Sequence, residues 1–241
     1  MAVLMLRKRH LIKSNRLKRI LRLLKRHKRE PLIQQMLPYG SQKQKRCCSM
    51  DSAVDRIYQD YKTMKSYLES QNEISLLSNY TNTFRKVLVL SCGSYFEAQI
   101  VSILTEYAER CSSGDVRIKN FIYNQALAGK YHTLFAWGEQ NEPTKPGKNA
   151  NKFYALFGPE FSEYVKKDLA QPQTKFGTPK EEINSSIQSF LELGHLRNIL
   201  VHSNFAEYSY DLKTPEEIYD LYGRAKLFIV YIKYLLLNIE I

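Results

Sequence analysis

The chain has 241 residues, of which 44% are hydrophobic and 12% aromatic, so it is not intrinsically disordered and can build one core with an appendage. Its four cysteines lack paired metal-ligand spacing and do not suggest a disulfide framework, and we expect a reducing, cytoplasmic location. No uninterrupted apolar run reaches the roughly 18 residues of a membrane span, so none is expected.

The net charge of +12 is concentrated at the N-terminus. Residues 1–50 contain 15 Lys or Arg and one acidic residue, which leaves residues 51–241 close to neutral. The sequence therefore divides into a basic amphipathic extension, 1–49, and a helical domain, 50–241. Four interpretations of the extension stay open: it binds RNA phosphates, lies on an anionic membrane surface, acts as a targeting segment, or precedes a true start at Met50.

Two helices with apolar residues at intervals of three and four follow the extension. The first is expected to begin after Asp51 or Ser52, either of which can cap it. The second is expected over about residues 76–110 and ends at the Ser-Ser-Gly sequence 112–114. Together they predict a helical hairpin.

The next segment, up to Gly177, has a looser pattern. Helices over residues 116–128 and 161–169 are expected on either side of a polar loop, 138–151. Trp137, at the entrance to the loop, is interpreted as a packing anchor, with base stacking as the alternative. Three lysines are interpreted as solvated side chains in preference to nucleic-acid contacts: Lys145, Lys148 and Lys152.

Two Thr-Pro sequences predict the starts of the last two helices. Thr178 and Thr214 are each followed by Pro and, three residues after the Thr, by Glu, which is the capping-box pattern. Apolar residues at helical spacing continue after each box. The sequence thus predicts an all-α protein, an up-and-down helical bundle with an inserted helical and loop segment.

The end of the first of these helices concentrates groups that can hold a phosphate and move a proton. At about 100° per residue, His195, Asn198 and His202 share one stripe, whereas Arg197 lies about 140° from His202. Arg197 and His202 would meet if the last turn unwinds, if the Arg side chain wraps round, or if a second copy supplies the partner group. Without other knowledge, a solvated Arg and a His at the C-terminal carbonyls is the favoured interpretation.

Arg197 and Asn198, followed by three residues and His202, resemble the Arg-x4-6-His motif of the HEPN superfamily (higher eukaryotes and prokaryotes nucleotide-binding), and in particular the RiboL-PSP-HEPN branch of predicted RNases. Residues 87–98 are similar to that branch's second helix, in which small residues and a glutamate, here Glu97, face the motif helix. Residues 153–158 also fit its pattern, and the resemblance covers roughly 50–241.

The resemblance implies a metal-independent endoribonuclease, a toxin or defence effector in which two motif helices form one composite cleft across a homodimer. Histidine, with a pKa of about 6.5, suits proton transfer, and a guanidinium suits phosphoryl oxygens. We assign Arg197 to phosphate and transition-state stabilisation, His202 to acid–base work and Asn198 to orientation. Glu97 and His195 are supporting candidates. A salt bridge explains Glu97 equally well, and a structural role is preferred for His195. RNA, a second copy and an antitoxin or regulatory partner are the expected partners; no cofactor or metal is expected.

Two alternatives come from other classes. In the first, the chain is a non-catalytic HEPN dimer that binds nucleotides or a protein. In the second, it is a helical membrane-associated adaptor whose function is carried by its basic N-terminus. Metal hydrolases and nucleotide hydrolases are disfavoured, because the sequence has neither ligand-spaced His/Asp/Glu clusters nor phosphate-binding glycine loops. Some family members carry a tyrosine two residues after the His that a partner nucleotidyltransferase modifies; Asn204 stands there, which puts that route in doubt.

Overall fold

The regular elements of the protein are helical wherever the chain is described. A computed structural model describes residues 52–139, 142, 144–203 and 213–238, and within these ranges there are helices and two isolated β-bridges but no strand. The all-α prediction is therefore confirmed. The extension lies outside the described residues, so the division of the chain at residue 50 stays a prediction.

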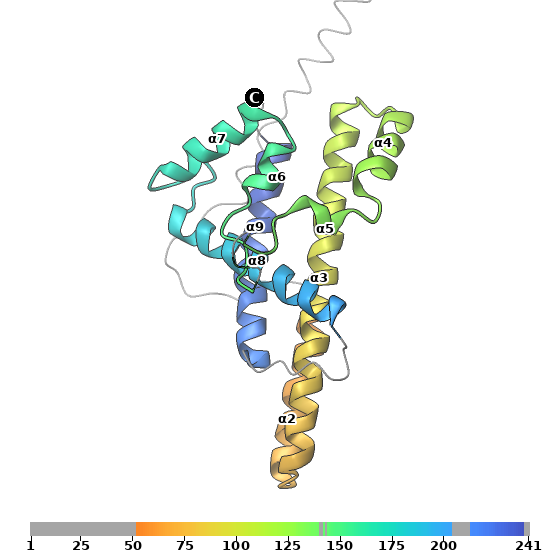
Figure 1. The fold of residues 1–241 in the computed structure, drawn as a ribbon, viewed down its shortest axis with the longest axis vertical. Coiled ribbons are helices and arrows are strands. Elements are labelled where there is room, and N and C mark those ends of the chain that lie inside the picture. Colours follow the sequence, from red (N-terminus) through yellow and green to blue (C-terminus); the bar gives the residue numbers. More distant parts are fainter. Residues whose placement is uncertain (1–51, 140–141, 143, 204–212, 239–241) are drawn as a thin grey trace, which may run out of the picture. The chain divides into compact units, whose positions relative to one another are not determined.

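The first two described helices form the predicted hairpin. These are α2 (Ala53–Ser70) and α3 (Ile74–Cys111), which pack against each other and overlap in the lower part of Figure 1. Ser52 caps α2 in a capping box, in which its Oγ accepts from the Asp55 N–H at 3.1 Å and the Asp55 carboxylate accepts from the Ser52 N–H at 2.9 Å. Tyr61 of α2 stacks on Phe84 of α3 with ring centroids 4.3 Å apart, which fixes the hairpin.

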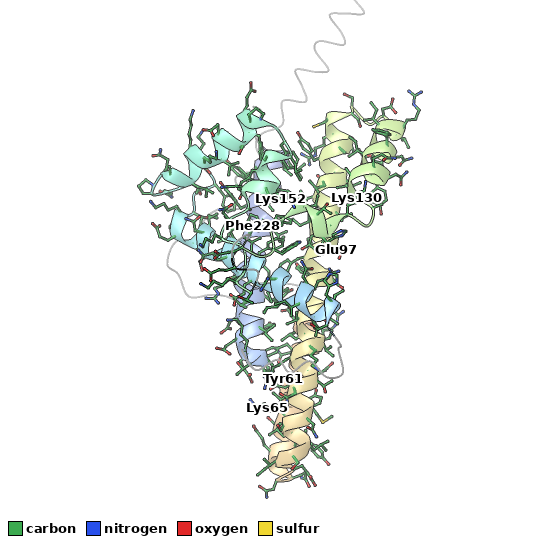
Figure 2. All side chains as sticks on the ribbon, viewed as in Figure 1. Tyr61, Lys65, Glu97, Lys130, Lys152 and Phe228 are labelled. Atoms are coloured by element: carbon green, nitrogen blue, oxygen red, sulfur yellow. The ribbon has the colours of Figure 1, made fainter. Side chains whose placement is uncertain are left out.

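The core lies where α3 meets α8 (Lys180–His202) and α9 (Pro215–Leu237). Figure 1 shows α8 lying across both of the other helices, and α8 packs most extensively on α9. Phe190 of α8 contacts Phe96 of α3 and Phe228 of α9, with centroid separations of 5.5 and 5.0 Å. All three rings are buried, and Figure 2 labels Phe228 at this crossing. The second half of α8 is therefore held against the longest helix of the fold.

Helix α3 is long and apolar enough to cross a membrane. Its most apolar 18-residue window has a mean hydropathy of 1.6, and 44% of that window is buried inside the protein. The uninterrupted apolar runs of the sequence do not reveal this, because uncharged polar residues such as Ser91 and Ser94 interrupt them without lowering the mean much. The core helix of a bundle has the same length and composition, and α3 buries Leu88, Phe96 and Ile100 in the core, so the feature is weak evidence for a span.

Between α3 and α8 the chain forms short elements. They are α4 (Val116–Ile122), a π-helical turn η2 (Tyr123–Leu127), α5 (Tyr131–Leu134), α6 (Asn151–Ala155) and α7 (Pro159–Ala170). The helix predicted over 116–128 is confirmed up to Leu127, but its second half is π-helical and not α-helical. There the Ala128 N–H reaches back five residues to the Tyr123 carbonyl at 2.8 Å, and Gly129 follows with φ of 67°. The helix predicted over 161–169 is confirmed as α7.

The two predicted capping boxes have different outcomes. The box at Thr214 is present, since its Oγ1 accepts from the Glu217 N–H at 3.2 Å and the Glu217 carboxylate accepts from the Thr214 N–H at 2.7 Å. The box at Thr178 is wrong, because Pro179 and not Thr178 is the N-cap of α8, and the carbonyl of Thr178 instead accepts from the N–H and the hydroxyl of Thr174 and closes a turn. Helix α8 begins one residue after Pro179, which has no side-chain acceptor.

Candidate active site

A tryptophan outside α8 sets the position of its second half. The ring of Trp137 lies against the Cα of Gly194, so closely that any Cβ at residue 194 would overlap it. The Trp137 indole N–H donates to the His132 carbonyl at 2.8 Å, and the side chain is 7% exposed. The interpretation of Trp137 as a packing anchor is confirmed, and it fixes α8 three residues before Arg197.

His195 is a buried side chain that holds a loop. It is 6% exposed, and its Nε2 lies 3.1 Å from the carbonyl oxygen of Thr144. The hydrogen bond ties the loop before α6 to the motif helix, which is the structural role preferred from the sequence. It also turns the imidazole away from solvent.

Arg197 lies in a notch that a glycine makes in α3. An added Cβ at Gly93 would come 2.9 Å from the Arg197 Cγ and 3.4 Å from its Cβ, so the side chain occupies the space that alanine would need. Gly93 is itself buried within α3. The aliphatic part of Arg197 therefore crosses α3 at Gly93. The polar groups next to this crossing set the direction of the guanidinium.

Two polar groups hold the guanidinium. Its Nη2 lies 3.6 Å from the carboxylate of Glu97, one turn of α3 beyond Gly93, and its Nη1 donates to the Asn198 Oδ1 at 3.3 Å. Both charged side chains are accessible, with exposed fractions of 27% for Arg197 and 37% for Glu97. Figure 2 labels Glu97 on the central part of α3. Asn198 thus orients Arg197, and no hydrogen bond joins it to His202, the ring that the spacing suggested it would orient.

Two further titratable groups lie close to these residues. Burial raises the pKa of Tyr131, and the nearby Glu97 carboxylate raises it further while Arg197 acts in the opposite sense. Burial also raises the pKa of the Cys92 thiol, next to Gly93 in α3. Neither group is ionised at neutral pH, so neither is available there as a base or a thiolate nucleophile. Tyr131 was not foreseen, because nothing in its local sequence indicates that it lies near the motif.

His202 is the last residue of α8 and its side chain is exposed. The helix continues to this residue, so the last turn does not unwind to bring His202 round to Arg197. The Arg197 side chain does not wrap toward it either, since the guanidinium is held by Glu97 and Asn198. Unwinding of the last turn and wrapping of the Arg197 side chain are therefore not the arrangements of the structure. On a regular helix the positions of Arg197 and His202 lie about 140° apart.

The structure joins Arg197 to Asn198 and Glu97 by a hydrogen bond and an ion pair, and among the described residues no such interaction joins these three to His195 or His202. The catalytic roles of these residues stay predictions. The loop lysines are engaged locally: Lys148 pairs with Glu139 at 2.9 Å, and Lys145 pairs with Glu142. In the described ranges no group of three His, Cys, Asp or Glu side chains is placed to share a metal ion.

The family model for RiboL-PSP-HEPN matches residues 55–238, which is most of the chain and includes both α3 and the motif on α8. The chain belongs to the RiboL-PSP-HEPN family. HEPN domains are generally RNases, often act on RNA and are often dimeric, so an RNase-type function follows at this coarse level. No curated protein and no solved structure matches the chain.

Proposed function

We propose that the protein is a metal-independent endoribonuclease, a cytoplasmic toxin or defence effector whose composite Arg-x4-His site forms between two copies of the chain. The observation that supports this is the placement of Arg197 and His202 on one uninterrupted helix. The guanidinium lies against α3, whereas the imidazole is exposed on another side of α8. Since one chain does not direct both groups at a common point, a second copy supplies the missing partner.

The chemistry needs few protein groups because RNA carries its own nucleophile. One His202 imidazole takes the proton of the 2′-hydroxyl as its oxygen attacks the phosphorus. The bond from phosphorus to the 5′-oxygen breaks, and an imidazolium donates a proton to that oxygen. The products are a 2′,3′-cyclic phosphate and a 5′-hydroxyl. Arg197 stabilises the charge that develops on the non-bridging oxygens. A dimer provides two imidazoles, which makes separate base and acid roles easier, although one imidazole can take the first proton and then return it to the leaving oxygen.

The ion pair of Arg197 with Glu97 is loose enough to yield to a phosphate. Its 3.6 Å separation exceeds the roughly 2.7–2.9 Å of a strong charge-assisted hydrogen bond. Both side chains are partly exposed, and pairs of this kind contribute about 1 kcal/mol or less. Glu97 therefore positions the guanidinium in the free protein, and an RNA phosphate can replace the Glu97 carboxylate at a small cost in free energy. The same contact is what a non-catalytic HEPN dimer would show, and cleavage assays separate the two functions.

The first experiment tests cleavage and its dependence on the motif. Purified full-length protein is incubated with RNA in EDTA, and the ends of the products are mapped. We expect cyclic or 3′-phosphate ends and 5′-hydroxyl ends, lost in His202→Ala. His132→Ala, an exposed histidine outside the motif, is the matched control and is expected to cleave normally. Strict dependence on a divalent metal, or full activity of His202→Ala, would contradict the proposal; RNA binding without cleavage would favour the non-catalytic dimer.

A second experiment tests the composite site directly. Arg197→Ala and His202→Ala chains carrying different tags are co-expressed, and the mixed dimers are purified through both tags. Each homodimer is expected to be inactive. The mixed dimer retains one intact guanidinium and one intact imidazole on opposite chains, so it is expected to recover cleavage. An inactive mixed dimer with a normal fold would place the catalytic pair within one chain.

Cellular tests address the toxin role and the extension. Expression of the wild-type chain is expected to arrest growth, and His202→Ala is expected to remove that effect while accumulating to the same level. Deletion of residues 1–49 is expected to leave cleavage in vitro largely intact, because the family match begins at residue 55. An inactive truncation that still folds would assign a catalytic contribution to the basic extension.

A further inference from the structure

A cavity of about 290 Å³ lies between α6, the end of α7 and the first half of α8. Its apolar lining includes Ala150, Tyr154, Leu169 and Ile187. This volume is near the lower end of the range for small-molecule sites, which are mostly apolar with a few placed polar groups. The cavity uses none of the motif residues.

The polar lining of the cavity includes carboxamides. Asn184 and Gln188 lie one turn apart on α8, and Asn151 lies at the start of α6. None of these three amides has a hydrogen bond to a described residue, and all three are exposed. A carboxamide presents a donor and an acceptor side by side, which is complementary to the edge of a nucleobase. Lys148, which pairs with Glu139, also lines the cavity.

We infer that this cavity is a base-binding subsite, in which a nucleobase of single-stranded RNA lies against Leu169 with its edge toward the amides of Asn184 and Gln188. The inference rests on the proposed RNase function and adds a determinant of where the RNA is cut. Gln188 precedes His202 by 14 residues, about 21 Å along α8 and about 40° around it, so both side chains lie on the same side of the helix. The rigid helix therefore sets the distance between the recognised base and the imidazole, and this distance selects the scissile phosphate.

Binding of isolated nucleotides tests the subsite. AMP, GMP, CMP and UMP are titrated into the full chain by calorimetry, with ribose 5-phosphate as a probe that has the phosphate and sugar but no base. At least one nucleotide is expected to bind about tenfold more tightly than ribose 5-phosphate, and Asn184→Ala/Gln188→Ala is expected to remove that difference. Asn82→Ala, an exposed amide on α3 outside the cavity, is the matched control and is expected to bind normally. Equal binding of all five probes, or no effect of the double variant, would overturn the subsite.

Competition identifies the source of the base. A short single-stranded oligoribonucleotide is added to the nucleotide complex of His202→Ala, which is not expected to cut it. Displacement of the nucleotide is expected for an RNA subsite, whereas a nucleotide that stays bound would make the cavity a site for free nucleotides and refute the RNA role. The Asn184→Ala/Gln188→Ala variant, in a chain that keeps His202, is expected to cleave RNA with a changed site preference. Unchanged preference with active cleavage would refute the subsite alone; loss of cleavage in the first EDTA assay with intact nucleotide binding would refute the nuclease alone.

Discussion

Replacement of Gly93 by alanine tests the notch that holds Arg197. The new methyl would lie 2.9 Å from the Arg197 Cγ, and real Cβ atoms do not approach other heavy atoms closer than about 3.0 Å, so one of the two must move. The side chain of Arg197 is the freer partner, since Gly93 is fixed within α3. We expect the guanidinium to shift by several tenths of an ångström, which weakens its ion pair with Glu97 and its hydrogen bond to Asn198.

The expected magnitudes follow from two opposing effects. Overpacking of a close contact costs about 1–3 kcal/mol, whereas Gly to Ala inside a helix stabilises by about 1 kcal/mol. Gly93→Ala is therefore expected to reduce the free energy of unfolding by about 0–2 kcal/mol. A displacement of about 1 Å at a catalytic group can lower a rate by about a hundredfold, so a loss of about ten- to a hundredfold in RNA cleavage is expected.

Urea unfolding and RNA cleavage in EDTA are measured on the same preparations. Gly223→Ala is the matched control, because Gly223 lies within α9 and an added Cβ there meets nothing within 4 Å. It should stabilise the protein by about 1 kcal/mol and leave cleavage unchanged. If Gly93→Ala stabilises the protein as Gly223→Ala does and keeps full activity, the placement of Arg197 against α3 is wrong.

Three further outcomes are expected. Gly194→Ala should destabilise by about 3 kcal/mol or more in urea unfolding, since its Cβ would overlap the Trp137 ring; a near-neutral effect would show that the ring is not packed there. Thr214→Ala should cost about 1 kcal/mol in the same assay through loss of the α9 cap, with Thr214→Ser as the conservative control that should retain most of it. Burial tends to raise the pKa of Asp55, but hydrogen bonds with Ser52 and Tyr219 and the charge of Lys226 outweigh it and lower the pKa overall. The stability that Asp55 contributes is thus present above its unfolded pKa of about 3.9 and lost as pH falls through the lower folded pKa, and thermal unfolding of Asp55→Asn between pH 3 and 5 should show a shallower loss than wild type.

Local signals predicted the helices well where no other structure competes for the same residues. The Thr214 box forms because its hydrogen bonds lie within four residues. The same pattern at Thr178 fails because a second local structure, the turn from Thr174 to Thr178, forms there and α8 begins two residues later, at Lys180. The π-helical turn after Ile122 likewise has no distinct periodicity that would separate it from an ordinary helix.

The candidate site was predicted in part. The similarity of residues 87–98 to a family helix indicated that Glu97 faces the motif, and the ion pair with Arg197 agrees with that orientation. The angular spacing on a straight helix also gave the separation of Arg197 from His202. The contribution of Tyr131 and the Trp137 contact with Gly194 depend on packing between segments more than 30 residues apart, which periodicity along one helix does not report.

The divergent directions of Arg197 and His202 on α8 have a consequence for dosage. Under the proposed mechanism a single chain is chemically incomplete, so at concentrations below the dimer dissociation constant the rate of RNA loss rises with the square of the amount of protein. A cell would then tolerate a low basal level without an inhibitor, and a modest rise in synthesis would cross a threshold into rapid self-intoxication.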